Sequence, residues 1–514
     1  MAISRRFNIW RRKIWNHKNS THFKIKKEHP FGHSYWIVKF GGSDWTWTSD
    51  TRLFRPLLYQ LSYRTILYPY INTLCGKIKS IMKKINTSPL SGMQELLPTE
   101  QAIFNQLKQN ISDVYHHYGF LSIETPLIDR QEILLAKAGG DTEKQIYKVI
   151  KTAEDDSKSD QALRFDHTVP LARYVVEHNN DLAFPFSVTQ IGRNFRGERA
   201  QRGRFREFYQ CDADIIGREK LPIAYDAKVI ACIHDALKTF NLPNMVIRIS
   251  NRKVLAGFLQ ALNLSNKTGA ISNVIDHAEK VPLETTREHL AKLGLSETEV
   301  GQVCDFMFTN GSYSEIENKL TEILGDKIEA VREGLNELKE VFTILDQKQG
   351  ISSTIIDFMI IRGLDYYTGT VYEIMLKDHR EIGSISGGGR YENLASNFTD
   401  QKFPGVGGSI GLTRLFFVLR EYNLLPKNEQ KQPVDYVIFP LTANEYTFSF
   451  ELADKLRAEG KNVDIDFDDR KLGAKFNRAA KIADFAIVVG ESEAKSRAVS
   501  AKNLVSGELT EIKL

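Results

Sequence analysis

Several features are scarce in this chain of 514 residues, and each shortage excludes a class of protein. Its four cysteines include no Cys-X-X-Cys pair, which excludes a disulfide framework and argues against a structural zinc site. No run of about 18 apolar residues occurs, so the sequence predicts no transmembrane helix. Because 42% of the residues are hydrophobic and 26% are charged, the chain is neither wholly disordered nor collagen-like.

Acidic residues are nearly absent from the first 84 residues. This segment has 17 Lys or Arg against three acids, a net charge of +14, which leaves −9 for the rest of a chain whose total is +5. Tryptophan is equally uneven, because all five tryptophans lie within the first 47 residues. The chain therefore reads as two unlike parts, a basic N-terminal extension over residues 1–84 and a net-acidic remainder.

Three interpretations of the basic extension remain open. Residues 1–27 are rich in Arg and Lys and contain no acid, as in a mitochondrial transit peptide, although serine is sparse. Basic and aromatic residues are also interleaved, as in a nucleic-acid-binding tail. From residue 41 to residue 75 we find no steady period of 2 or 3.6. We therefore expect an extension that is disordered or not part of the working protein, which would then begin near Met82.

Regular patterns begin after Ser88. Residues 98–118 carry apolar side chains three and four positions apart, which predicts an amphipathic helix that Gly119 ends. Residues 120–128 alternate between apolar and polar, which predicts a strand, and Pro126 assigns that strand to an edge or an interface.

The most informative stretch is 187–217, in which six arginines fall within 14 residues. Segments 187–195 and 204–216 read as strands around a middle that contains Gly197 and Gly203, which predicts a hairpin with a long loop. The period of two places an aromatic, an amide and two carboxylates on one face of the second strand, namely Phe208, Gln210, Asp212 and Asp214. The other face receives Phe205, Ala213 and Ile215. A polar face of this kind beside guanidinium groups, which match phosphate oxygens, predicts a site for a phosphorylated ligand next to an amine-bearing one.

Three further segments carry candidate site residues. Residues 163–175 place Asp166 and Thr168 at the end of a short strand, ahead of a helix. Residues 361–375 are rich in Tyr and Thr, and residues 384–394 contain three consecutive glycines without the context of a phosphate-binding P-loop. Residues 405–419 read as a glycine-rich strand that enters a helix, with Arg414 near the start of that helix.

Three of these blocks resemble the signature motifs of class II aminoacyl-tRNA synthetases: the helix and strand with Pro126, the arginine hairpin, and the glycine strand and helix with Arg414. The segments RGLDYYTGTVYE (362–373) and SGGGRYENL (386–394) are similar to the motif pair of the histidyl-tRNA synthetase family. The resemblance runs from about Ser91 to the C-terminus. It implies an α+β catalytic domain on an antiparallel sheet with flanking helices, a helical insertion, and a C-terminal α/β anticodon-binding domain.

The resemblance also implies roles for matching residues. The α-amino group of histidine would be bound by Asp166, Thr168 and Gln210. The imidazole would be contacted by Asp214, Tyr366 and Tyr367. Two catalytic arginines would act at the reacting carboxylate and the α-phosphate, Arg196 and Arg362.

For ATP, the resemblance implies that Glu198 meets the adenine amino group and that Phe208 stacks on the ring. Arg196 would hold the α-phosphate, and Arg204 and Arg414 would hold the outer phosphates. Fixed guanidinium groups aimed at developing negative charge stabilise a transition state without reorganising. We expect Mg²⁺ on the ATP phosphates and no metal held by protein ligands alone.

Two positions depart from the commonest family pattern. Thr413 stands before Arg414, where an acid is frequent, and Asp166 stands where some members have Glu. The shorter Asp166 keeps the charge but alters the expected geometry of the pocket.

The rest of the chain completes the expected domains. Residues 85–430 would form the catalytic domain, with a helical insertion at about 250–350 that either faces tRNA or serves only for packing. Residues 431–514 read as βαβαβ, a small sheet with helices on its faces, which the resemblance identifies as the anticodon-binding domain. One helix there carries basic residues that could contact RNA or simply face solvent, namely Lys471, Lys475 and Arg478.

The expected activity is histidine–tRNA ligation, with histidine, ATP and tRNA(His) as partners, a homodimer as the assembly and no membrane association. The main alternative is a histidine-sensing regulatory paralogue without aminoacylation activity. A synthetase for proline, threonine or glycine is a second alternative, against which the 362–373 block argues. The expected location is the cytoplasm, or the mitochondrion if the basic extension is a transit peptide.

Overall fold

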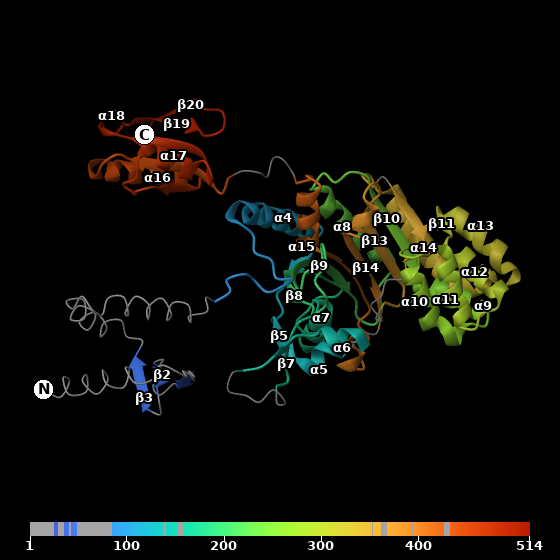
Figure 1. Ribbon diagram of the computed structural model, residues 1–514. Coiled ribbons are helices and arrows are strands. Elements are labelled where there is room, and N and C mark those ends of the chain that lie inside the picture. The colour runs from blue at the N-terminus through green and yellow to red at the C-terminus, as the bar shows by residue number, and fades with distance from the viewer. Residues whose placement is uncertain are drawn as a thin grey trace. The chain divides into compact units, whose positions relative to one another are not determined.

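The computed structural model describes residues 25–28, 35–40, 43–48, 85–136, 140–151, 159–351, 353–360, 367–392, 394–425 and 432–513. The chain divides into two compact units, residues 1–88 and 89–514, and each is described by itself (Figure 1). In the first unit, strands β1 (Ile25–Glu28), β2 (Tyr35–Phe40) and β3 (Ser43–Thr48) form an antiparallel sheet. Strand β3 lies in a segment where the sequence showed no regular period.

A nine-stranded sheet forms the centre of the second unit, in the order β11-β12-β10-β13-β14-β15-β9-β8-β4. In chain order the strands are β4 (Leu121–Ser122), β8 (Phe186–Phe195), β9 (Glu207–Ile216), β10 (Met245–Asn251), β11 (Asn310–Gly311), β12 (Thr354–Asp357), β13 (Thr370–Leu376), β14 (Ser386–Tyr391) and β15 (Gly405–Ile410). Only the β10–β12 and β4–β8 pairs of this sheet are parallel. The mostly antiparallel sheet confirms the fold class expected from the sequence.

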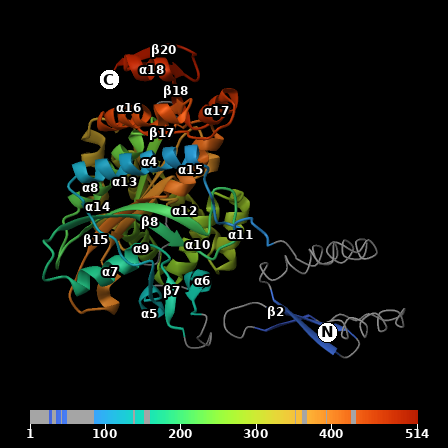
Figure 2. The same ribbon diagram turned by 90° about the vertical axis from the view of Figure 1, so that its left-hand side faces the viewer.

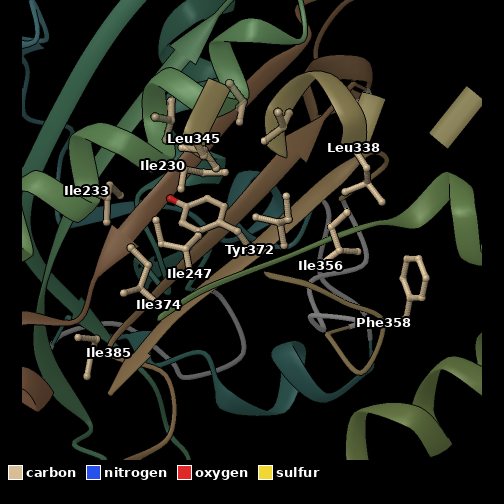
Figure 3. Close-up of a cluster of buried hydrophobic side chains, with 14 of the residues drawn as sticks. Ile230, Ile233, Ile247, Leu338, Leu345, Ile356, Phe358, Tyr372, Ile374 and Ile385 are labelled. Atoms are coloured by element: carbon tan, nitrogen blue, oxygen red, sulfur yellow. The ribbon is translucent and has the colours of Figure 1, made fainter. Parts of the chain in front are cut away.

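The two faces of the sheet are covered differently. Helices α4 (Pro98–His117), α8 (Ala224–Lys238) and α15 (Leu412–Glu421) pack on one face, and α7 (Thr168–Glu177) packs on the other (Figure 2). The first face holds a large apolar core, in which the ring of Tyr372 lies among isoleucine and leucine side chains (Figure 3). The helix expected over residues 98–118 is confirmed, with Ile103, Leu107 and Ile111 buried.

The strand expected over residues 120–128 is confirmed only in part, and the part that forms lies at the edge of the large sheet, as Pro126 indicated. Only Leu121–Ser122 joins the large sheet, as β4, and the chain then leaves it. Pro126 lacks an N–H to donate, so the ladder cannot continue through it. The chain resumes as β5 (Ile128–Arg130), which forms a second sheet with β6 (Lys148–Val149) and β7 (Gln161–Leu163). Short helices α5 (Gln131–Leu134) and α6 (Gly140–Gln145) lie between these strands in the chain.

Residues 252–347 are largely helical, as the sequence predicted. The helices are α9 (Arg252–Ala261), α10 (Thr268–Ala278), α11 (Leu283–Lys292), α12 (Glu297–Met307), α13 (Tyr313–Leu324) and α14 (Arg332–Gln347). Stacked aromatic rings join these helices to the sheet. The ring centre of Phe306 lies 4.2 Å from that of Phe258 and 4.6 Å from that of Phe358, which follows β12. The insertion therefore shares one apolar core with the sheet.

The C-terminal part contains the expected βαβαβ unit. It consists of β16 (Val434–Pro440), α16 (Tyr446–Ala458), β17 (Val463–Ile465), α17 (Leu472–Ala479) and β18 (Ala483–Val489). After α18 (Glu491–Ser496), strands β19 (Ala498–Asn503) and β20 (Leu509–Lys513) add an antiparallel hairpin that the sequence analysis did not predict. Among the described residues, the structure has no helix with the length and apolarity to cross a membrane.

Candidate active site

Strand β9 supplies the floor of the candidate site. On one face of the strand, Cys211, Ala213 and Ile215 are fully buried in the apolar core. On the opposite face, the Nε2 of Gln210 donates to the Oγ of Ser409 at 2.8 Å, and Asp214 is only 4% exposed. The predicted division of β9 into an apolar and a polar face is therefore confirmed.

Helix α7 brings a second carboxylate to this face of the sheet. The Oδ1 of Asp166 accepts hydrogen bonds from the backbone N–H groups of Thr168 and Val169, at 3.1 and 3.2 Å. These are among the N–H groups at the start of a helix that have no partner within it. The carboxylate of Asp166 is thus held at the N-terminus of α7, directly after the short strand β7, as the sequence predicted.

Burial controls the charge of both carboxyls. Burial raises the pKa of Asp214 well above its ordinary value, and the nearby Asp212 carboxylate adds to the rise. Burial also raises the pKa of Asp166, although the Val169 N–H and the Arg196 guanidinium oppose that effect. Carboxyl groups whose pKa is raised by burial are suited to a cationic ligand, because its positive charge stabilises their ionised form.

Arg196 lies over two aromatic rings at the mouth of the hairpin. Its guanidinium carbon is 4.4 Å from the ring centre of Phe165 and 5.0 Å from that of Phe208. Its Nε also donates to the backbone oxygen of Phe165 at 3.4 Å. Arg196 therefore joins the hairpin to the segment that leads into Asp166.

The six arginines of the hairpin have different partners. Arg193 pairs with Glu207 at 3.1 Å, and Arg202 pairs with Glu421 of α15. Arg206 donates to the backbone oxygens of Ser91 and Glu198. Arg204 is half-exposed and lies 3.4 Å from a Glu198 oxygen. The contacts of Arg193, Arg202 and Arg206 thus hold the loop in place, while Arg204 is exposed and Arg196 is part-buried against its two rings.

The expected residues from later segments are only partly described. Arg414 donates to the backbone oxygen of Ile382, and a Cβ on Gly203 would lie 3.8 Å from the Arg414 side chain, so Arg414 adjoins the hairpin loop. Tyr367 packs in a small cluster with Tyr391, and its backbone oxygen accepts from Arg252 at 3.3 Å. Arg362 and Tyr366 lie outside the described residues.

One residue of the site was missed by the sequence analysis. The hydroxyl of Tyr391 donates to Oδ1 of Asp214 at 3.0 Å, and both groups are buried. The segment around Tyr391 was singled out for its glycines and for its resemblance to a family motif, and no role was expected for Tyr391 itself. The period of two along β14, which places Tyr391 on one face with Gly387 and Gly389, is the signal that could have found it.

The basic helix of the C-terminal part is less available than the sequence suggested. Lys475 is 6% exposed, and its Nζ donates to the backbone oxygen of Asp466 at 3.0 Å. Arg478 pairs with Asp464 and Asp466, at 2.9 and 3.1 Å. Only Lys471 is an exposed member of the three. Lys475 and Arg478 therefore hold the helix to β17, which favours the packing interpretation for them.

Comparisons with known proteins agree with the geometry. The family model described as histidyl-tRNA synthetase matches residues 92–415, and the model described as anticodon binding domain matches residues 435–514. The chain is 42% identical over 435 residues to a curated histidine–tRNA ligase of Clostridium tetani, covering 83% of this chain and 96% of that protein.

Solved structures give the same result. The crystal structure of histidyl-tRNA synthetase from Nostoc sp. PCC 7120 matches with a TM-score of 0.73 and 38% identity, over 84% of this chain and 97% of that one. A Bacillus halodurans structure titled an ATP phosphoribosyltransferase regulatory subunit/histidyl-tRNA synthetase matches with a TM-score of 0.65 and covers 79% of this chain and 99% of that one. At 21% identity that match shows a shared fold alone.

The buried carboxyl of Asp214 gives a stability prediction. An unfolded Asp releases its proton near pH 4, whereas the folded protein holds the proton to higher pH, so stability falls as pH rises between the two pKa values. We expect Asp214→Asn to raise the thermal midpoint of the unliganded protein at pH 8, by about 2–4 °C for each kcal/mol gained. The gain should shrink at pH 5, where less of the ionisation cost is present.

Thermal unfolding followed by circular dichroism at both pH values checks this prediction. Asp400→Asn, which changes an exposed carboxyl, serves as the control and should leave the midpoint unchanged. A midpoint lowered by Asp214→Asn at pH 8 would contradict the account.

Proposed function

This chain belongs to the histidyl-tRNA synthetase family, and we propose how its residues divide the work of a histidine–tRNA ligase. The enzyme activates histidine with ATP to give histidyl-adenylate and pyrophosphate, and then transfers histidine to the 3′ end of tRNA(His). The observation that supports the assignment of residues is the polar face of β9, which carries Gln210 and Asp214 and has Asp166 near enough to Asp214 to raise its pKa.

The buried carboxyls receive histidine in this proposal. Asp166 pairs with the α-ammonium group, with Thr168 and Gln210 beside it. Asp214 accepts from the imidazole, supported by Tyr367, Tyr366 and Tyr391. A site built to hydrogen-bond a polar ring rejects side chains that leave its buried groups unpaired, which is a stronger filter than an apolar pocket.

The arginines receive ATP. In the activation step, the histidine carboxylate forms a bond to the α-phosphorus while the bond to the β-phosphate oxygen breaks and pyrophosphate leaves. In this proposal, Arg196 and Arg362 act on the reacting groups and stabilise the negative charge on the α-phosphate. Arg204 and Arg414 hold the outer phosphates. Glu198 and Phe208 bind adenine, the first by its carboxylate and the second by stacking.

Mg²⁺ is proposed as a companion of ATP. The described part of the chain has no cluster of three or more His, Cys, Asp or Glu side chains that could hold a metal. Such a protein fits a metal that is bound mainly by nucleotide phosphates and water, with at most one or two carboxylates from the chain. The metal would supply positive charge at the phosphates.

The remaining proposals concern tRNA and location. The C-terminal domain, which matches the anticodon-binding model, binds the anticodon region of tRNA(His). Since Lys475 and Arg478 are occupied within the domain, Lys471 is the basic group of that helix that faces RNA. The cytoplasm is the proposed location, a reducing compartment that suits the free buried thiols of Cys211, Cys232 and Cys304.

ATP–pyrophosphate exchange tests the function. We expect exchange with histidine and none with proline, threonine or glycine, and a chain that exchanges with none of them would favour the regulatory alternative. Arg196→Ala should reduce exchange by about 10²–10³, the usual loss when one charge-stabilising donor is removed. The matched variant Arg202→Ala, whose guanidinium pairs with Glu421, should stay within about twofold of the wild type. Equal losses in the two variants would refute the role of Arg196.

Two glycine-to-alanine substitutions test the proposed contact between Asp214 and histidine. A Cβ on Gly407 would lie 1.8 Å from Oδ1 of Asp214, so Gly407→Ala must displace that carboxylate. On Gly411, the nearest side-chain atom belongs to Arg414 at 3.9 Å, so Gly411→Ala meets no clash. We expect Gly407→Ala to raise KM for histidine by about tenfold or more, with KM for ATP unchanged, and Gly411→Ala to change neither. If Gly407→Ala binds histidine normally, Asp214 is not in contact with the ligand.

A homodimer is also proposed, through the edge of the sheet at β4. Strand β4 pairs only with β8 among the described strands, and its surroundings expose apolar side chains: Leu121 at 62%, Leu127 at 41% and Ile128 at 44%. Exposed apolar side chains beside an unpaired edge are typical of an interface.

The mass in solution checks this proposal. Wild-type protein should have twice the mass of the chain in light scattering, and Leu121→Lys should shift it toward the monomer. The control is Leu509→Lys in β20, which alters a residue of similar exposure (68%) and should leave the mass unchanged. A monomeric wild type would rule out the dimer.

A further inference from the structure

A buried histidine–aspartate contact lies within the candidate site and has no role in the reaction described above. The Nδ1 of His167 is 3.1 Å from Oδ2 of Asp212, and the two side chains are 1% and 5% exposed. In the described structure, both ring nitrogens of His167 and Oδ1 of Asp212 have no hydrogen bond of acceptable geometry, so Nδ1 of His167 and Oδ2 of Asp212 are in close contact without one. A buried polar pair that lacks hydrogen-bond partners contributes little to the stability of a fold. We therefore interpret this pair as part of the site.

The pair connects the two segments that carry the histidine ligands. His167 stands between Asp166 and Thr168 at the start of α7. Asp212 stands between Gln210 and Asp214 on the polar face of β9. The contact therefore fixes the α-amino subsite against the imidazole subsite, although 45 positions separate the two residues in the chain.

Backbone contacts make both partners rigid. The Nε2 of Gln190 donates to the backbone oxygen of His167 at 3.4 Å, and the Oγ1 of Thr189 donates to that of Asp212 at 2.8 Å. Both donors lie on β8, directly across from β9. The pair is thus held from a third segment that does not contact histidine in the proposed function.

Several ionisable side chains surround the pair. Asp166 and Asp214 lie close enough that the Asp212 carboxylate raises the pKa of each, in both cases after burial as the larger cause. On the other side, a Cβ on Gly192 would lie 2.5 Å from Nη2 of Arg164 and 3.3 Å from Nε2 of His167, so both side chains cover that glycine. Arg164 itself is directed to the backbone oxygens of Arg193 and Thr125, at 2.9 and 2.6 Å. Arg196 faces Asp166 from the hairpin.

We propose that His167 and Asp212 form a positioning pair for histidine: their contact holds the two ligand segments in register, which leaves Asp166 and Asp214 to receive the amino acid. The proposal rests on the proposed function, because it assigns a purpose to groups beside the histidine subsite. His167 touches neither substrate nor the reacting atoms and acts through Asp166 and Asp214.

A double-mutant cycle in ATP–pyrophosphate exchange tests the pair. His167→Leu leaves the Asp212 carboxylate buried without its partner and should raise KM for histidine by about tenfold or more, while KM for ATP stays within about twofold. The double variant His167→Leu/Asp212→Asn removes both the imidazole and the carboxylate that it contacts, and should recover most of the loss. His178→Leu at the other end of α7 is the matched control and should change neither KM.

Three results would overturn the proposal: a wild-type KM for histidine in His167→Leu, an equal rise in both KM values, or effects of the two substitutions that simply add. If His167→Leu does not fold, His167→Gln decides in the same assay, since Gln keeps a donor for Asp212 and should raise KM for histidine only modestly. An effect on both KM values in His167→Gln would reject the pair. Absence of histidine exchange in the wild type would instead reject the proposed function.

Discussion

The candidate site depends on carboxyl groups that are buried away from water, on the central sheet and beside it. Asp166, Asp212 and Asp214 are each less than 8% exposed, and each is stabilised by a different group: backbone N–H donors of α7, the imidazole of His167, and the hydroxyl of Tyr391. Desolvation makes such groups costly, but it also makes them selective, because an electrostatic contact is stronger in a low-dielectric site than in water. The neighbouring strands and helices supply the polar contacts that offset the cost of desolvation.

Glycine sets the spacing of this layer. Gly407 of β15 pairs with Asp214 of β9, and any side chain at 407 would occupy the space of the carboxylate. The three glycines of β14 lie in the next strand, so backbone and not side chain borders the site from that direction. A Cβ on Gly388 would meet the backbone of Gly407, so the consecutive glycines let β14 and β15 approach closely, whereas Gly405 and Gly407 of β15 leave room for Tyr391 and Asp214.

Local patterns were predictable because they need only neighbours in the chain. Helix α4, the β8–β9 hairpin and the two faces of β9 all follow from periods of 3.6 and 2, and the structure confirms them. The strand expected over residues 120–128 is confirmed only in part, because the chain leaves the large sheet after Ser122 and resumes as β5 in another sheet at Ile128. The β19–β20 hairpin was missed. The interpretation of Lys475 and Arg478 changed because their partners, Asp464 and Asp466, lie outside their own helix.

The sequence by itself determined the family, the polarity of each face of β9 and the residue types available for histidine and ATP, since motif and period are properties of consecutive residues. Only the tertiary structure decided which of these groups meet. The contacts of Asp214 with Tyr391, of Asp212 with His167 and of Arg202 with Glu421 join residues 177, 45 and 219 positions apart. Sheet order brings such residues together, and with them the burial that alters the charge of each carboxyl, so the electrostatics of the site are a property of the fold.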